Sequence, residues 1–139
     1  MAKSITVNET INAPIQKVWD FYTMPEHIMK WNNASPDWHT PKAENDLRAG
    51  GRFLSRMEAK DGSQGFDFTG TYDEVVDKSL IKYTMDGEDK RKVAISMKEE
   101  NGQTKIEVTF DLENENPEEV QRGGWQSILN NFKSYVEGN

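Results

Sequence analysis

The sequence predicts an α+β domain in which a curved antiparallel sheet wraps around a long C-terminal helix and leaves an internal cavity. Three observations predict this class: a strand pattern followed directly by two short helices, alternating segments separated by tight-turn dipeptides, and a long amphipathic segment at the end. The expected order is β-α-α-β(5-6)-α, with consecutive hairpins forming a meander. The 139 residues fit one domain, 1–139.

Residues 3–11 are the first expected strand. Ile5, Val7 and Ile11 share one face at a period of two, which is typical of a half-buried strand. Glu9 interrupts the alternation, and it marks either a bulge or a polar position on the inward face.

Two short helices are expected next. Pro14 begins the first one, because a proline loses no helical hydrogen bond in the first turn. Its apolar side chains recur at helical spacing and form one buried face: Ile15, Val18, Trp19 and Tyr22. Before the second helix, which ends near Trp31, Thr23 and Glu26 have the spacing of a capping box.

Turn signals divide the following region into strands. The dipeptides that supply the positive φ of tight hairpins are Asp61-Gly62, Asp86-Gly87 and Asn101-Gly102, with a weaker signal at Asp77-Lys78-Ser79. The expected strands are 51–59, 65–76, 80–85, 91–98 and 104–112. Apolar and charged residues alternate along them, so we expect one covered face and one solvated face.

The last segment is expected to be the long helix. Asn116 is placed to cap it, Pro117 takes its first position, and Glu118 and Glu119 lie at the positive end of its dipole. One apolar stripe is expected to cover the sheet: Val120, Trp125, Ile128, Leu129, Phe132, Tyr135 and Val136. A helix over 117–137 would be roughly 30 Å long, enough to cross a sheet.

Two glycine pairs lie in different kinds of expected element and are expected to have different structural roles. Gly123-Gly124 lies inside the long helix, where each glycine costs roughly 0.5–1 kcal/mol relative to alanine. The pair either loosens the helix into a gate, gives a ligand space, or allows the helix to approach the sheet closely. Gly50-Gly51 is expected to permit a turn or bulge at the start of a strand.

Composition excludes several classes of function. The net charge of −7 is spread along the chain, so no nucleic-acid partner is expected. The chain has no cysteine, which excludes disulfides and thiolate chemistry and agrees with a reducing cytoplasm. No apolar run reaches the roughly 20 residues of a membrane span, and the first residues lack a signal peptide's apolar stretch. We expect a cytoplasmic monomer that does not insert into membranes.

Five motifs carry a resemblance to a known family: Ile11-Asn12-Ala13-Pro14 with Val18-Trp19, Thr23-Met24-Pro25-Glu26 with Trp31, the segment from Asp46 to Phe53, Phe68-Thr69-Gly70-Thr71-Tyr72, and Trp125 with Leu129. In this order, over essentially the whole chain, they resemble the START/SRPBCC superfamily with its birch-pollen-allergen-like helix-grip fold. More narrowly, the chain resembles the bacterial family named after the activator of heat-shock-protein-90 ATPase. The resemblance implies a cavity between sheet and C-terminal helix, in which family members bind lipids, sterols, flavonoids or polyketides.

Large inward-facing residues are the expected lining of that cavity, because ligand pockets are mainly apolar with a few polar anchors. The candidates are Trp31, Phe53, Phe66, Phe68, Tyr72, Tyr83, Met85, Met97, Trp125, Leu129 and Phe132. The other interpretation is that these side chains only fill the core, as inward apolar residues usually do. Tyr72 and Tyr83 are the candidate polar anchors, since a buried phenol needs a hydrogen-bond partner.

The sequence offers little for catalysis. His27 and His39 are the only histidines, and neither belongs to a ligand-spaced cluster such as His-x-x-x-His. We therefore expect no metal, no cofactor and no dedicated catalytic residue. His39 is the better candidate of the two, because it lies with Asp37 and Trp38 near the expected pocket mouth.

Three functions from different classes follow. The favoured one is a non-enzymatic binder of a small hydrophobic or amphipathic molecule, held beneath the helix 117–137. The second is an enzyme of the cyclase or hydratase kind, with His39 or a tyrosine as its acid–base group. The third is an interaction module in stress response or chaperone regulation, which would bind a protein partner through an exposed apolar patch.

Overall fold

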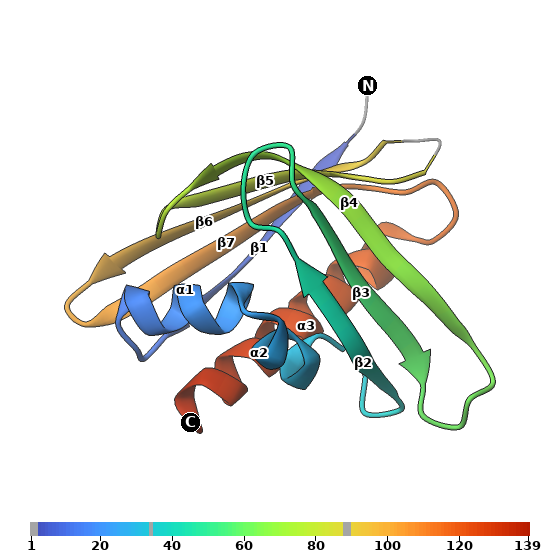
Figure 1. Cartoon of the computed structure of the whole chain (residues 1–139), viewed down its shortest axis with the longest axis horizontal. Coiled ribbons are helices and arrows are strands. Elements are labelled where there is room, and N and C mark those ends of the chain that lie inside the picture. Colours follow the sequence, from blue (N-terminus) through green and yellow to red (C-terminus); the bar gives the residue numbers. More distant parts are fainter. Residues whose placement is uncertain (1–2, 34, 88–89) are drawn as a thin grey trace.

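The computed structural model describes residues 3–33, 35–87 and 90–139. Figure 1 shows the helices packed on one side of the sheet. The elements are β1 (Ser4–Ile11), α1 (Ile15–Thr23), α2 (Pro25–Trp31), β2 (Trp38–Asn45), β3 (Arg52–Ala59), β4 (Gly65–Val76), β5 (Leu80–Met85), β6 (Lys92–Glu100), β7 (Gln103–Asp111) and α3 (Glu118–Glu137).

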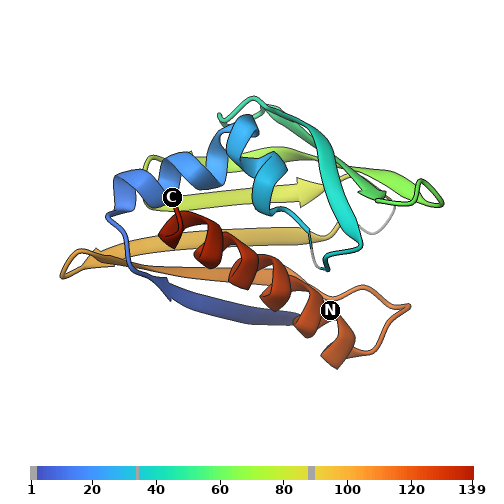
Figure 2. The ribbon, with the colours of Figure 1, turned by 90° about the horizontal axis from the view of Figure 1, so that it is seen from below.

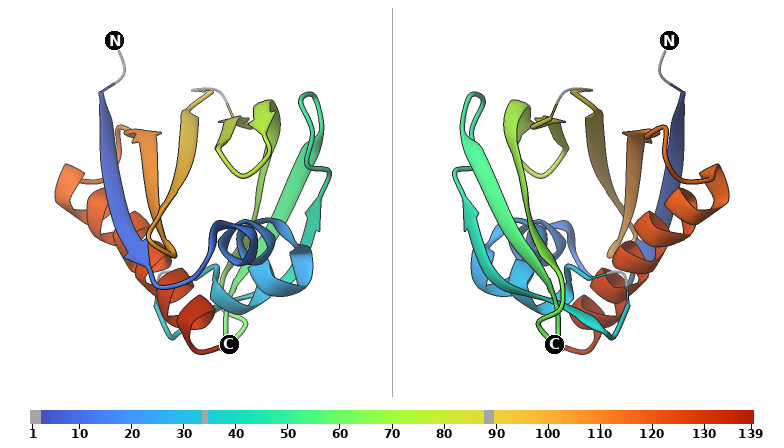
Figure 3. Two further views of the ribbon diagram at one scale, coloured as in Figure 1. Left: turned by 90° about the vertical axis from the view of Figure 1, so that its left-hand side faces the viewer. Right: turned by 90° about the vertical axis from the view of Figure 1, so that its right-hand side faces the viewer.

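The seven strands form one antiparallel sheet in the order β1-β7-β6-β5-β4-β3-β2. The sheet curls into a trough, with α3 along the side of β1 and the pair α1–α2 on the opposite side (Figure 3). Figure 2 shows α3 lying obliquely across the concave face. The expected α+β class and its helix-grip architecture are therefore confirmed.

Strand β1 pairs with β7 without interruption, from Ser4 opposite Asp111 to Ile11 opposite Thr104. This continuous register contradicts a bulge at Glu9. Glu9 instead occupies a half-buried position on the same face as the buried Ile5, so the polar inward position is the correct alternative.

The start of α1 is capped from a distant strand. The Ile15 amide donates to the Glu99 carboxylate over 2.6 Å, which holds α1 against the end of β6. The expected capping box before α2 is wrong. Thr23 is the last residue of α1, and its hydroxyl donates to the Trp19 carbonyl over 2.8 Å rather than accepting from Glu26. Met24 takes the cap position of α2.

Strand β2 is not among the strands whose bounds the sequence predicts, although the expected order β-α-α-β(5-6)-α allows a sixth strand there. It forms the edge of the sheet and pairs only with β3, so it can include Pro41, whose missing N–H would disrupt a central strand. The pairing is irregular between His39 and Lys42, on either side of that proline. An edge strand that contains polar residues and a proline lacks the apolar alternation by which strands are predicted from sequence.

Helix α3 packs its second half into the core. Phe132 and Val136 are fully buried, as is Phe110 of β7, and the Phe132 ring packs against Tyr22 of α1 and Trp31 of α2. The first turn departs from the expectation. Val120 is 60% exposed and does not belong to the buried stripe. Asn116 does not cap the helix, because its side chain donates to Glu113 and Pro117 takes the cap position.

Within the described residues, no helix is long and apolar enough to span a membrane.

The turn at Gly50-Gly51 is confirmed, and both positions require glycine. Gly50 has a φ of +84°, which favours a residue without a Cβ atom. A Cβ on Gly51 would lie 2.0 Å from the carbonyl oxygen of Asp46. This turn connects β2 to β3 and lets their inward side chains face the same space.

An apolar cavity between the sheet and the helices

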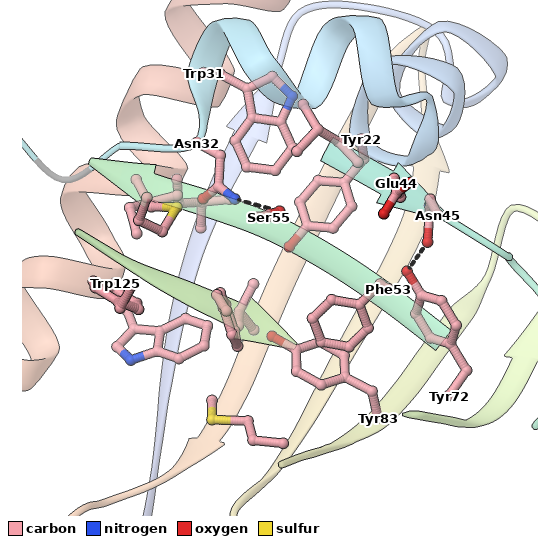
Figure 4. A pocket seen from close by; sticks show the side chains of 18 of the residues that line it. Tyr22, Trp31, Asn32, Glu44, Asn45, Phe53, Ser55, Tyr72, Tyr83 and Trp125 are labelled. Carbon is pink, nitrogen blue, oxygen red and sulfur yellow. Dashed lines mark hydrogen bonds between the residues drawn. The ribbon is translucent and has the colours of Figure 1, made fainter. Parts of the chain in front are cut away.

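One half of the trough is hollow. A cavity of about 310 Å³ lies between strands β2–β5, Val108 of β7, the α1–α2 pair and the middle of α3 (Figure 4). Its lining residues are Tyr22, Ile28, Trp31, Asn32, Glu44, Asn45, Phe53, Ser55, Met57, Phe66, Phe68, Tyr72, Tyr83, Met85, Arg91, Val108, Trp125, Ile128 and Leu129. The lining is mostly aromatic and aliphatic, which is the usual character of a small-molecule site.

Nine of the eleven expected lining residues surround this cavity: Trp31, Phe53, Phe66, Phe68, Tyr72, Tyr83, Met85, Trp125 and Leu129. The structure does not bring Met97 and Phe132 there. Phe132 is fully buried, with Tyr22 and Trp31 packed edge-on against its ring. Met97 is buried two residues before Glu99, at the end of β6 that holds the start of α1. Both side chains lie where the helices fill the trough, and period-two alternation does not distinguish filled positions from hollow ones.

Aromatic packing builds the floor of the cavity. The Phe53 ring lies directly over Gly70, where a Cβ atom would come within 2.7 Å of it. The same ring meets Tyr83 edge-on at a centroid distance of 4.7 Å and Phe68 at 5.5 Å. Phe66 is 53% exposed and lines the cavity as well, so it contacts both the interior space and solvent.

Most polar groups of the lining are already satisfied by the protein. The Tyr72 hydroxyl donates to the Asn45 side-chain oxygen, and the Asn45 amide donates to the Thr23 carbonyl over 2.6 Å. The Asn32 amide donates to the Ser55 hydroxyl over 3.3 Å. These bonds tie β2 and β3 to the helices and leave the apolar surfaces facing inward (Figure 4).

Tyr22 and Tyr83 differ from Tyr72. Their rings are fixed by packing, Tyr22 against Trp31 at 5.0 Å and Tyr83 against Phe53. Neither hydroxyl forms a hydrogen bond within the described part of the chain. Burial raises the pKa of both phenols, and the neighbouring Tyr72 raises each pKa further, so both groups stay protonated at neutral pH. The sequence analysis predicted Tyr83 as a polar anchor and did not predict Tyr22. Tyr22 could have been recognised because it places a hydroxyl on an otherwise apolar helix face.

Charge at the cavity is balanced. Arg91 lines the cavity with a side chain that is 26% exposed, and it forms an ion pair with Glu113 at 3.9 Å. Glu44 adds a carboxylate to the lining from β2. Arg91 and Glu44 carry opposite charges, so the described lining residues together carry no net charge.

The two histidines lie outside the cavity lining. His27 stacks on Phe21 at a centroid distance of 4.0 Å, and its Nδ1 is hydrogen-bonded to the Tyr135 hydroxyl at 2.7 Å, which joins α2 to α3. His39 lies on β2 opposite Glu58 and does not reach the cavity, because the edge strand places its side chain elsewhere. Among the described residues, no three His, Asp or Glu side chains group together as metal ligands.

Comparison with known proteins agrees with this architecture. The family model described as "Activator of Hsp90 ATPase homolog 1-like protein" matches residues 12–137. No curated protein matches the chain significantly.

Solved structures match almost the whole chain. An AHSA1-like protein from Aeromonas hydrophila is 43% identical with a TM-score of 0.91, covering 98% of this chain and 93% of that one. A protein from Cytophaga hutchinsonii is 53% identical with a TM-score of 0.83 and the same two coverages, 98% and 93%. A protein from Chromobacterium violaceum shares the fold at 23% identity, a TM-score of 0.88 and 99% coverage of both chains. The chain therefore belongs to the family of activator of Hsp90 ATPase homologue 1-like proteins.

Proposed function

We propose that this protein binds a small hydrophobic or amphipathic molecule in the cavity between its sheet and α3. The observation that carries the proposal is the cavity itself, about 310 Å³ in volume and walled by aromatic side chains from both sheet and helices. That volume lies at the lower end of the roughly 300–1,000 Å³ range of ligand pockets. Lipids, sterols, flavonoids and polyketide-like molecules are the candidate classes. Family membership supports the same proposal, because related folds commonly hold such ligands.

The energetic argument favours an apolar occupant. Transfer of apolar surface from water into the cavity contributes roughly 25 cal/mol per Å². Rings such as Phe53 and Tyr83 are already held by edge-on contacts, so a ligand need not order them. A preformed wall lowers the entropic cost of association.

The other functions stay in second place. None of the described lining residues is a histidine. Of the acid–base groups named for the cyclase or hydratase alternative, only the tyrosines therefore line the cavity. The interaction module in stress response or chaperone regulation is the third candidate, and a cytoplasmic location is an expectation from the sequence.

Amide NMR titration of the protein with fatty acids, sterols, flavonoids and aromatic polyketides tests the proposal. We expect at least one class to give saturable shifts clustered on residues 66–72, 83–85 and 125–132. Ile128→Trp places an indole into the cavity wall and should abolish these shifts. Val120→Trp is the matched control on the same helix, because Val120 is exposed and does not line the cavity.

Two results would count against the proposal. One is the absence of saturable shifts with every class in the wild-type protein. The other is binding that survives in Ile128→Trp, since this would locate the ligand outside the cavity. Circular dichroism of both variants verifies that each is folded.

A further inference from the structure

Two tyrosine hydroxyls at the cavity form no hydrogen bond with the described part of the chain. Tyr22 reaches it from α1 and Tyr83 from β5, and their hydroxyl ends enter the same space from opposite sides (Figure 4). Tyr83 is only 9% exposed, and its hydroxyl has no hydrogen-bond partner among the described residues. A phenol O–H that faces a mostly apolar cavity gains a hydrogen bond when a ligand atom accepts its proton.

We propose that the ligand carries a carbonyl oxygen that accepts hydrogen bonds from both Tyr22 and Tyr83. This inference rests on the proposed function, since it assigns a chemical group to the molecule in the same cavity. A carbonyl oxygen has two lone pairs and no proton of its own, so it can accept from two donors that face the same space.

Chemistry of the remaining lining supports this assignment. Burial raises the pKa of both phenols, so they donate at neutral pH and do not act as anions. The third phenol, Tyr72, already donates to Asn45. The ligand's polar end therefore meets Tyr22 and Tyr83, and its apolar remainder contacts the side of the cavity formed by Trp125 and Ile128.

A neutral oxygen fits better than a carboxylate. A buried carboxylate requires a dedicated cation, and the cation of the lining, Arg91, is paired with Glu113 at 3.9 Å. Glu44 also lines the cavity and would repel an anion. The ligand class is therefore a ketone, ester or amide, or a hydroxylated aromatic ketone, with an apolar body.

Benzophenone and diphenylmethane test this inference, because they share a body and differ by the carbonyl oxygen. Wild-type protein should bind benzophenone more tightly. Tyr22→Phe and Tyr83→Phe should each lower benzophenone affinity by about tenfold, as expected for one hydrogen bond, and leave diphenylmethane affinity unchanged. Tyr135→Phe is the matched control, since Tyr135 bonds His27 and does not line the cavity.

The carbonyl stretch of bound benzophenone gives an independent readout. Its infrared band should lie at lower frequency in the wild-type protein than in apolar solvent, and it should return toward the apolar value in the Tyr22→Phe, Tyr83→Phe double variant. Equal binding of both compounds, with an unshifted band, would overturn the carbonyl assignment and leave the hydrophobic cavity intact. Failure of both compounds to bind would overturn the proposed function together with this inference.

Discussion

At the scale of single residues, Asp86 links by hydrogen bonds the strands that form the cavity floor. Its carboxylate accepts two hydrogen bonds from Arg52 of β3, at 2.9 and 2.5 Å, and one from the Thr69 hydroxyl of β4 at 2.6 Å. Asp86 itself directly follows β5. The Arg52 and Thr69 hydrogen bonds lower the pKa of Asp86 to about 2. One exposed side chain thus connects three neighbouring strands on the outer face.

Asp86→Asn should change how the free energy of unfolding depends on pH. A carboxylate with a lowered folded pKa contributes stability that is complete above its unfolded pKa of about 3.9 and is lost as the pH falls toward the folded value. The wild-type protein should therefore lose its advantage over Asp86→Asn between about pH 4 and pH 2. Urea unfolding across that window measures the difference.

Asp37→Asn is the control for charge alone, because the Asp37 carboxylate is exposed and forms no hydrogen bond or ion pair with the rest of the described chain. A constant difference between wild type and Asp86→Asn at every pH would contradict the account of Asp86.

Residue roles were only partly predictable from the sequence. Inward-facing positions such as Phe53 and Tyr83 follow from alternation, because a strand has a period of two. Tyr22 was identified as part of a buried helix face, but its place in the cavity depends on how α1 lies over the trough. The position of the helices over the trough also explains why Phe132, which belongs to the predicted apolar stripe, packs in the core and does not line the cavity.

At the scale of elements, the glycine pair in α3 lowers the stability of the helix, and packing does not require it. A Cβ atom at Gly123 or Gly124 would meet no other atom within 4 Å. The expectation of close approach between helix and sheet is therefore wrong. The two alternatives that stand are a loosened helix and space for a ligand, and both place the pair beside Trp125 of the cavity wall.

Gly123→Ala should stabilise the protein by about 0.5–1 kcal/mol, because alanine restricts the unfolded chain and fits the helix without contact. For a domain of this size, that corresponds to a rise of about 2–4 °C in Tm. Gly138→Ala is the matched control at the end of α3, where a Cβ would lie 3.1 Å from the Ser134 carbonyl oxygen. A fall in Tm for Gly123→Ala would show that the glycine is required structurally.

Elements with strong periodicity or turn dipeptides were predictable, and those defined by distant contacts were not. The hairpin signals led to β3–β7 within a few residues of their observed bounds. Strand β2 forms at an edge around Pro41, so it lacks apolar alternation. The cap of α1 comes from Glu99, far along the chain, and no local motif indicates it.

At the scale of the whole molecule, the trough is divided into a filled half and a hollow half. Helix α3 runs along β1, and its later turns pack against α1 and α2, where Phe132 and Val136 have no exposed surface. Strands β2–β5 curve away from α3 and enclose the cavity with α1 and α2 (Figure 3). The filled half accounts for a stable fold, and the hollow half leaves apolar surface available to a ligand.

The most direct test of this account is a crystal structure of the protein pressurised with xenon, which occupies apolar cavities without needing polar partners. We predict xenon between β2–β5 and α3, in contact with side chains such as Phe53, Met85 and Leu129. A trough in which side chains fill this space, or a cavity that takes up no xenon, would contradict the claim that the protein holds an apolar binding site.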